Sequence, residues 1–148
     1  MNGMQTERTI EIDAPIEHVF DVATQRVGEW STVVVEDKWS GGKTEGVGAE
    51  FEVVTEDRGK RMDFQGVVTQ WNPPHGSESD MFGKYFDIHV KNELEDLGGR
   101  TRLTQISSVN GKGFFKIMFA LTGWMMRKSS CDSLDKELAG LKRLAEAD

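Results

Sequence analysis

Six strand-like segments fill residues 33–109, and each is separated from the next by a short turn. The segments are Val33–Trp39, Val47–Glu56, Arg61–Trp71, Glu78–Gly83, Tyr85–Asp96 and Arg100–Val109. Glycine or proline marks most of the turns, at Gly41-Gly42, Gly59, Pro73-Pro74 and Gly98-Gly99. A crossover to a parallel neighbour needs about a dozen residues or more. Because these turns are shorter, we expect successive strands to be antiparallel.

The segment at residues 86–94 indicates which face of the sheet is buried. Apolar and polar side chains alternate there: the apolar set is Phe86, Ile88, Val90 and Leu94, and the polar set is Asp87, His89, Lys91 and Glu93. Such alternation is typical of a strand with one face in the core and one face in water. Residues Thr6–Asp13 alternate in the same way and add a strand at the N-terminus, so we expect six to seven strands.

Two short helices are expected between the first strand and the rest of the sheet. Asp13-Ala14-Pro15 is typical of a helix start, with a capping carboxylate and a proline in the first turn. The next residues give one apolar stripe, made of Ile16, Val19, Phe20 and Ala23. A second, shorter helix is expected around Arg26–Trp30.

After Gly113 the pattern becomes helical to the end of the chain. One stripe at helical spacing contains Cys131, Leu134, Leu138, Leu141 and Ala145. This helix is the only apolar surface large enough to cover the buried face of the sheet. The sequence therefore predicts an α+β fold in residues 1–148, taken as one domain, in which an antiparallel sheet wraps round a long C-terminal helix. A sheet bent round one helix rarely fills completely, so we expect an apolar cavity between them.

The first part of this helix, Phe114–Met126, is apolar almost all round, and Arg127 falls near the centre of the stripe. A kink or break near Arg127–Ser130 would rotate the apolar face and leave Arg127 in water. A straight helix would instead point Arg127 into the cavity, where a guanidinium demands an anionic partner such as a carboxylate or phosphate. We favour a break in this helix, or an Arg127 side chain that reaches water, over an Arg127 that points into the cavity. The apolar surface of Phe114–Met126 is interpreted as cavity lining combined with a homodimer contact.

Several short motifs together resemble the START-like (SRPBCC) superfamily. They are TIEIDAPIEHVFDVAT, VGEWSTVVVE, EGVGAEFEV, VVTQWNPP, GGRTRLT and the terminal LKRLAE. Their order and spacing cover nearly the whole chain. The resemblance implies a helix-grip fold with a hydrophobic cavity and, commonly, binding or transport of lipids, isoprenoids, sterols or polyketides. It brings no universal catalytic motif, and fold alone does not establish function.

We expect the chain to bind or carry a small hydrophobic molecule. The expected cavity residues are Phe51, Phe64, Phe86, Ile88, Phe119, Thr122, Trp124 and Met126, with Arg127 as a polar anchor. One alternative is a polyketide cyclase or dehydratase, which needs an acid or base inside the cavity. Its candidate groups are Tyr85, His89, Gln105 and Arg127, of which Tyr85 and His89 are expected outside. A second alternative is a protein-interaction module like the helix-grip co-chaperone domains.

Composition excludes other classes of function. The net charge of −7 argues against nucleic acid and against anionic membrane surfaces as partners, because both favour clustered lysine and arginine. The single cysteine, Cys131, and the scattered His18, His75 and His89 give no metal-ligand spacing, so we expect no metal and no cofactor. The N-terminus lacks an apolar signal core, and Phe114–Met126 is shorter than the roughly 20 residues of a membrane span. We expect a cytoplasmic protein without stable membrane insertion.

Overall fold

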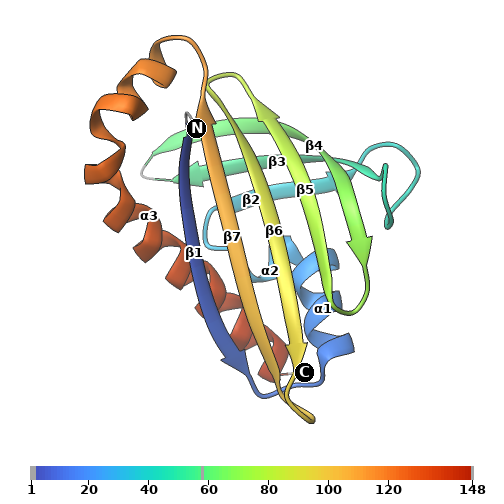
Figure 1. Ribbon diagram of the computed structural model, residues 1–148. Helices are drawn as coiled ribbons and strands as arrows, with labels where there is room; N and C mark the ends of the chain where they lie inside the picture. Colours follow the sequence, from blue (N-terminus) through green and yellow to red (C-terminus); the bar gives the residue numbers. More distant parts are fainter. Residues whose placement is uncertain (1–2, 58, 148) are drawn as a thin grey trace.

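A computed structural model describes residues 3–57 and 59–147, apart from the side chains at positions 119, 120 and 122–127. Seven strands form one antiparallel sheet in the order β1-β7-β6-β5-β4-β3-β2 (Figure 1). The strands are β1 (Gly3–Ile12), β2 (Val34–Trp39), β3 (Glu50–Asp57), β4 (Lys60–Asn72), β5 (Gly76–Gly83), β6 (Phe86–Asp96) and β7 (Thr101–Gly111). The helices are α1 (Ile16–Gln25), α2 (Val27–Trp30) and α3 (Phe114–Ala147). The predicted α+β architecture is confirmed.

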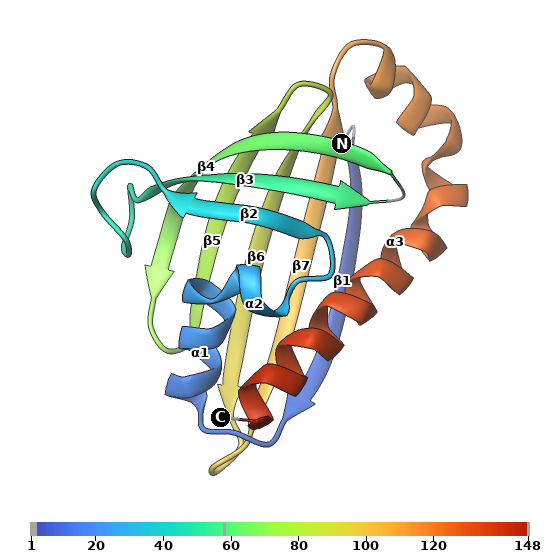
Figure 2. The same cartoon turned by 180° about the vertical axis from the view of Figure 1, so that it is seen from behind.

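The sheet bends strongly, so that β2, β3 and β4 run across the direction of β1, β7 and β6 (Figures 1 and 2). The pairing register shifts between Val68 and Gln70 of β4 and between Val34 and Glu36 of β2. An irregularity of this kind increases the local twist of a strand. The bend gives the sheet a concave face, and all three helices lie on that side (Figure 2).

The core lies at one end of this concave face, where α1 and the C-terminal half of α3 meet the sheet. Ile12, Val19, Leu103, Leu138 and Leu141 are almost completely buried there. The expected stripe of α3 faces this core, since Leu134, Leu138, Leu141 and Ala145 are buried, whereas Cys131 is only partly buried. The indole N–H of Trp30 donates to the carbonyl of Val22 at 2.8 Å and fixes α2 against α1.

The predicted cap of the first helix is wrong. The residue preceding α1 is Pro15, and no side chain caps the helix. Asp13 lies further upstream, and its backbone N–H donates to Glu146 Oε2 of α3 at 2.8 Å. Proline fixes its own φ in the range that leads into a helix. It therefore occupies the boundary position itself and leaves Asp13 too far from the free N–H groups.

The predicted break in the last helix is also wrong, because α3 is continuous from Phe114 to Ala147. It curves in its first turns, which lie beyond the edge of β1 (Figures 1 and 2). Phe114, Ile117 and Leu121 remain exposed on this part of the helix. The side chain of Arg127 lies outside the described residues, so its expected direction stays a prediction.

Gly140 marks a close approach of α3 to α2. A Cβ atom added at this glycine would collide with the carbonyl oxygen of Trp30. Replacing glycine by alanine inside an exposed helix usually stabilises a protein by about 1 kcal/mol. Gly140 is buried against backbone, which moves less easily than a side chain. Replacing it by alanine is therefore expected to destabilise the protein.

We predict that Gly140→Ala lowers the free energy of unfolding by about 1–3 kcal/mol, the usual cost of an overpacked contact. Urea denaturation followed by circular dichroism measures the change. The control is Asp132→Ala, at an exposed position of the same helix, which is expected to shift the free energy by less than about 0.5 kcal/mol. A more stable Gly140→Ala protein would contradict the close packing of α3 on Trp30.

Candidate functional site

A cavity of about 760 Å³ lies between the concave face of the sheet and the helices. Every strand contributes to its wall, and α1, α2 and α3 close it from the other side. From α3 the described lining residues are Ser129, Ser130, Ser133, Leu134 and Glu137. These residues lie near the middle of α3.

Aromatic rings form one wall of the cavity, on β3, β4 and β6. Phe51, Phe64 and Phe86 line it. Phe51 lies across Gly66, and Phe64 lies across Gly83, where an added Cβ would come within 2.6 Å of the ring. The two glycines therefore let aromatic rings rest directly on strand backbone. A larger residue at either position would push a ring toward the cavity.

The middle of the sheet presents three rows of side chains to the cavity, each running across several strands. The row nearest the start of α3 is apolar and contains Met4, Val109, Ile88 and Met81. The next is mixed and contains Thr6, Ser107, Val90, Ser79 and Val68. The third contains Gln105, Asn92, Ser77 and Trp71. The wall therefore becomes more polar with distance from the start of α3.

The third row holds an amide pair, in which Gln105 is buried and Asn92 is half-buried. Gln105 Nε2 donates to Asn92 Oδ1 at 2.9 Å, and the neighbouring Ser77 is buried. An amide has two N–H donors and an acceptor oxygen, so one mutual hydrogen bond leaves both side chains with further capacity. Buried polar groups are costly unless they are hydrogen-bonded. This row is therefore suited to polar atoms of a bound molecule.

The charged groups in the described lining come from β2, β3 and α3. They are Asp37, Lys38, Asp57 and Glu137. Glu137 is held by hydrogen bonds from the Ser31 hydroxyl at 2.5 Å, from the Thr32 backbone N–H at 2.6 Å and from the Thr32 hydroxyl. These bonds tie α3 to the segment between α2 and β2, so Glu137 has a structural role.

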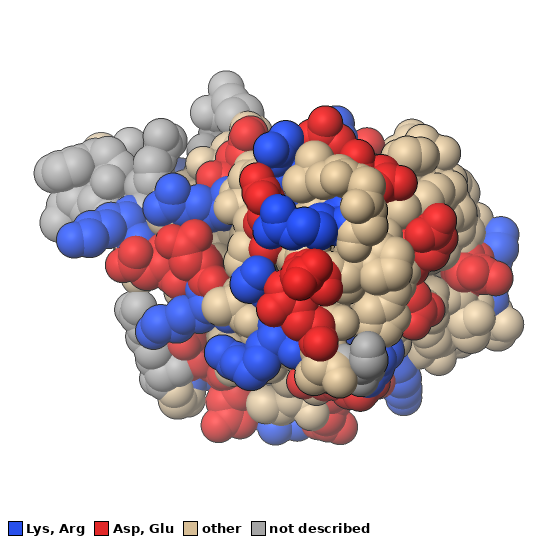
Figure 3. Space-filling view, turned by 90° about the horizontal axis from the view of Figure 1, so that it is seen from below, with Lys and Arg blue, Asp and Glu red and all other residues tan. Residues whose placement is uncertain are grey.

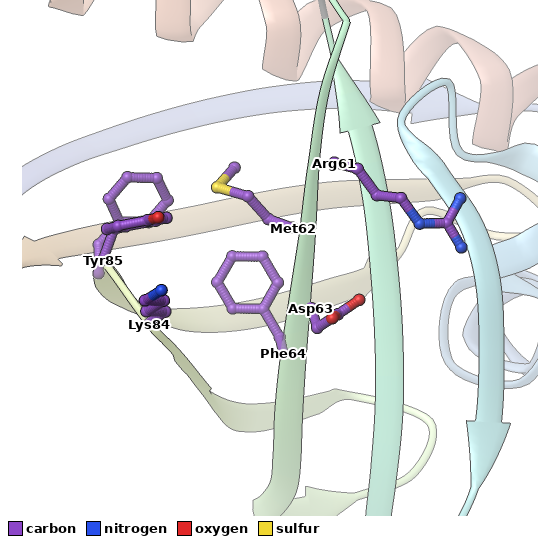
Figure 4. A pocket seen from close by; sticks show the side chains of 7 residues that line it. Arg61, Met62, Asp63, Phe64, Lys84 and Tyr85 are labelled. Carbon is purple, nitrogen blue, oxygen red and sulfur yellow. The ribbon is translucent and has the colours of Figure 1, made fainter.

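A second, smaller pocket of about 200 Å³ shares lining residues with the cavity and lies at the start of β4 and the β5–β6 turn (Figure 4). Met62 and Phe64 point toward Lys84 and Tyr85, whereas Arg61 and Asp63 point to the other side of β4 (Figure 4). Phe64 and Phe86 line both spaces, and their ring centroids are 6.3 Å apart. The walls of the two spaces therefore share this pair of rings.

The structure places four of the expected site residues around the cavity: Phe51, Phe64, Phe86 and Ile88. The side chains of Phe119, Thr122, Trp124, Met126 and Arg127 lie outside the described residues. The row around Asn92 and Ser77 was not expected from the sequence. The alternation of the strand would have predicted it, because Asn92 is two residues after Val90 and therefore lies on the same face of the sheet.

The enzyme alternative named Tyr85, His89 and Gln105, and the structure separates them. Gln105 lines the cavity, Tyr85 lines the small pocket, and His89 lies on the opposite, outer face of the sheet, as expected. There His89 Nδ1 is 2.5 Å from Asp80 Oδ1 and Nε2 is 2.9 Å from Glu78 Oε1. Burial lowers the pKa of His89, but hydrogen bonds to Asp80 and Glu78 and their charges raise it more, so the net pKa lies above 6.5.

Comparison with known proteins agrees with this geometry. The model of a family described as polyketide cyclase/dehydrase and lipid transport matches residues 4–146. A comparison with curated proteins finds no match.

Solved structures share the whole fold. A START superfamily protein from Mycobacterium smegmatis superposes with a TM-score of 0.82 at 16% identity, over 98% of this chain and 99% of that one. A protein from Thermus thermophilus superposes with a TM-score of 0.79 at 16% identity, over 97% of each chain. The Zhui aromatase/cyclase from Streptomyces sp. R1128 superposes with a TM-score of 0.75 at 12% identity, over 97% of this chain and 94% of that one. The START-like helix-grip fold expected from the sequence is confirmed.

The two carboxylates beside His89 predict a pH-dependent contribution to stability. The pKa of His89 is higher in the folded protein than its value of about 6.5 in the unfolded chain, so the protonated imidazole stabilises the fold. This stabilisation is complete at pH values below the unfolded pKa. It is lost as the pH rises through the folded pKa. The difference in free energy of unfolding between wild type and His89→Gln should therefore shrink between about pH 6 and about pH 9. Urea titrations at both pH values measure it.

NMR titration of the imidazole provides the matched control. Asp80→Asn removes one of the two charges and is expected to lower the pKa of His89 relative to wild type. A His89 pKa that is the same in wild type and Asp80→Asn, or a stability difference that is equal at both pH values, would contradict the role of these contacts.

Proposed function

Because the chain belongs to the polyketide cyclase/dehydrase and lipid transport family, we propose that it binds a small hydrophobic molecule in the cavity between sheet and helices. The observation that carries the proposal is the cavity itself. Its volume of about 760 Å³ falls within the roughly 300–1,000 Å³ of small-molecule sites. A lipid, an isoprenoid or a polyketide-like ring system would fit that space.

The rows of the sheet support an amphipathic ligand. The row containing Met81, Ile88 and Val109 offers only apolar contact, while Ser77, Asn92 and Gln105 offer hydrogen bonds. A site that is built to hydrogen-bond oxygen atoms discriminates against analogues that lack them, because its own polar groups are then left unpaired. The preferred ligand is therefore a hydrocarbon or aromatic body with hydroxyl or carbonyl groups at one end. These groups would lie at the Ser77–Asn92–Gln105 row.

The described lining supports binding more directly than a reaction. Acid–base catalysis needs a titratable group within hydrogen-bond reach of the substrate. Along the third row the described polar side chains are amides and a hydroxyl, which orient a molecule but do not exchange protons near neutral pH. Among the charged groups of the described lining, Glu137 is already bonded to Ser31 and Thr32. Asp37, Lys38 and Asp57 come from β2 and β3, which contribute no residue to this row. A role as a carrier follows from binding if the ligand is later released elsewhere.

Native mass spectrometry of the gently purified protein tests the proposal directly. We expect a bound small molecule that leaves on solvent extraction and is then identified as an oxygenated hydrophobic compound. A protein that retains no molecule, and that binds no member of a panel of fatty acids, isoprenoids and hydroxylated aromatics, would refute the proposal.

The Asn92–Gln105 pair predicts a preference between two ligands of similar shape. We expect 1,8-dihydroxyanthraquinone to bind more tightly than anthracene. Asn92→Leu is expected to weaken binding of the quinone about three- to tenfold, the effect of one lost hydrogen bond, and to leave binding of anthracene equal or stronger. Fluorescence titration measures both affinities.

The matched control is Asn110→Leu, on β7 of the same sheet, where the side chain is exposed and is absent from the described cavity lining. Asn110→Leu should leave both affinities unchanged. Equal losses for the quinone and anthracene in Asn92→Leu would indicate a distorted cavity and would contradict the role of this row in recognition.

A further inference from the structure

Positive charge is concentrated in one stretch of a chain whose net charge is −7. From Leu97 to Cys131 the sequence contains no aspartate or glutamate. The basic residues of this stretch are Arg100, Arg102, Lys112, Lys116, Arg127 and Lys128. This stretch spans β7 and the first half of α3, so its positive charges are divided between the two ends of the sheet (Figure 1).

The two arginines at the start of the stretch are neutralised by neighbours. Arg102 pairs with Glu95 at 2.8 Å and with Glu11 at 3.2 Å, and Arg100 pairs with Glu11 at 3.4 Å. Figure 3 views this end of the molecule and shows basic and acidic side chains mixed over its surface. At the other end, where α3 begins, Lys112 pairs with Asp87, and within the described residues no acidic side chain pairs with Lys116 or Lys128.

The first turns of α3 carry an exposed apolar face beside these basic residues. Phe114, Ile117 and Leu121 are 70%, 61% and 70% exposed. Their spacing of three and four residues places them on one side of the helix. Lys116 and Lys128 are also exposed on α3. The first turns project past the edge of the sheet in both views (Figures 1 and 2).

The β5–β6 turn extends this surface. Lys112 Nζ donates to the carbonyl of Gly83 at 2.7 Å and pairs with Asp87 at 3.0 Å. The ring of Tyr85 lies 5.2 Å from that of Phe115, and Lys84 lies 5.5 Å from the Tyr85 ring centroid. Both Lys84 and Tyr85 are exposed. We call Lys84, Tyr85, Phe114, Lys116, Ile117 and Leu121 the docking surface.

We propose that the docking surface binds an anionic lipid membrane. Exposed aromatic and aliphatic side chains beside lysines are the features by which a helix lies in the interface of a bilayer. Acidic headgroups would complement the lysines, while the negative charge elsewhere on the protein would be repelled and would orient it. Within the described residues no helix is long and apolar enough to cross a membrane. The proposed contact is therefore at the surface.

A second copy of the chain is a less favourable occupant. A twofold dimer brings the same patch of each subunit together. Lys84 and Lys116 of both copies would then face one another round a shared apolar contact, and like charges at an interface oppose association. An anionic bilayer has no such conflict. It satisfies both the apolar side chains and the lysines.

Vesicle sedimentation tests the proposal with the full chain. The vesicles are phosphatidylcholine alone, or phosphatidylcholine with phosphatidylserine. We expect binding to the phosphatidylserine vesicles only, and a loss of that binding at about 0.5 M NaCl, where charges are screened. Lys116→Gln should weaken binding about fivefold, the effect of one basic residue near an anionic surface. Ile117→Asp should abolish it.

Matched controls lie outside the docking surface. Lys136→Gln removes a lysine from the exposed side of the second half of α3, and Val47→Asp places an acid at an exposed apolar position on a distant loop. Both should bind vesicles like wild type. Asn92→Leu should do so too, since the cavity is not involved, and this separates the present proposal from the proposed ligand binding. Circular dichroism checks that each variant is folded.

Three outcomes would overturn the proposal. The first is equal sedimentation of wild type with and without phosphatidylserine vesicles. The second is vesicle binding that Ile117→Asp and Lys116→Gln leave unchanged. The third is a dimer in analytical ultracentrifugation that Ile117→Asp dissociates, with no vesicle binding, which would assign the docking surface to a second copy of the chain.

Discussion

The C-terminal half of α3 is anchored in the core, and this anchoring holds the helix over the concave face where the cavity lies. Leu138 and Leu141 are buried in the core, and Gly140 allows the helix to approach Trp30. Polar ties reinforce the same half: Lys142 Nζ donates to the carbonyl of Glu11 at 2.7 Å, and Glu146 accepts from the Asp13 backbone N–H. Ahead of Leu134 the described contacts of α3 with the sheet include Ser130 with Met4 at 3.7 Å and the ring of Phe115 with that of Phe86 at 6.1 Å. Between these contacts, Ser129, Ser130 and Ser133 line the cavity.

The chemistry of that space is set by strand register. Antiparallel pairing places side chains from neighbouring strands in rows, so one polar residue per strand is enough to produce a polar band. Asn92 pairs with Gln105 on one side and with Ser77 on the other. Shifting any of these strands by one residue would turn its contribution to the outer face. Strand pairing therefore also specifies the polar row that we propose for ligand recognition.

Local patterns predicted the sheet, the order of the helices and the apolar side of the C-terminal half of α3, because each depends on near neighbours in the sequence. Interactions between distant residues were predicted less well. The cap at Asp13 failed because Pro15 takes the boundary of α1, and Asp13 instead contacts Glu146 at the far end of the chain. The break near Arg127 failed because the helix continues through a segment without one consistent apolar face. The Asn92 row needed both the alternation of β6 and its register with β5 and β7, and only the first is visible in a single strand.

The ring pair of Phe64 and Phe86 bears on how large a molecule the protein can accept. Both rings line the main cavity and the neighbouring small pocket, so the walls of the two spaces share these side chains. Side chains change rotamer far faster than strands rearrange. Turning either ring aside would join the two spaces without disturbing the sheet. In the proposed binding role, the rotamers of these two phenylalanines would govern the length of ligand that the protein accepts, while the sheet stays unchanged.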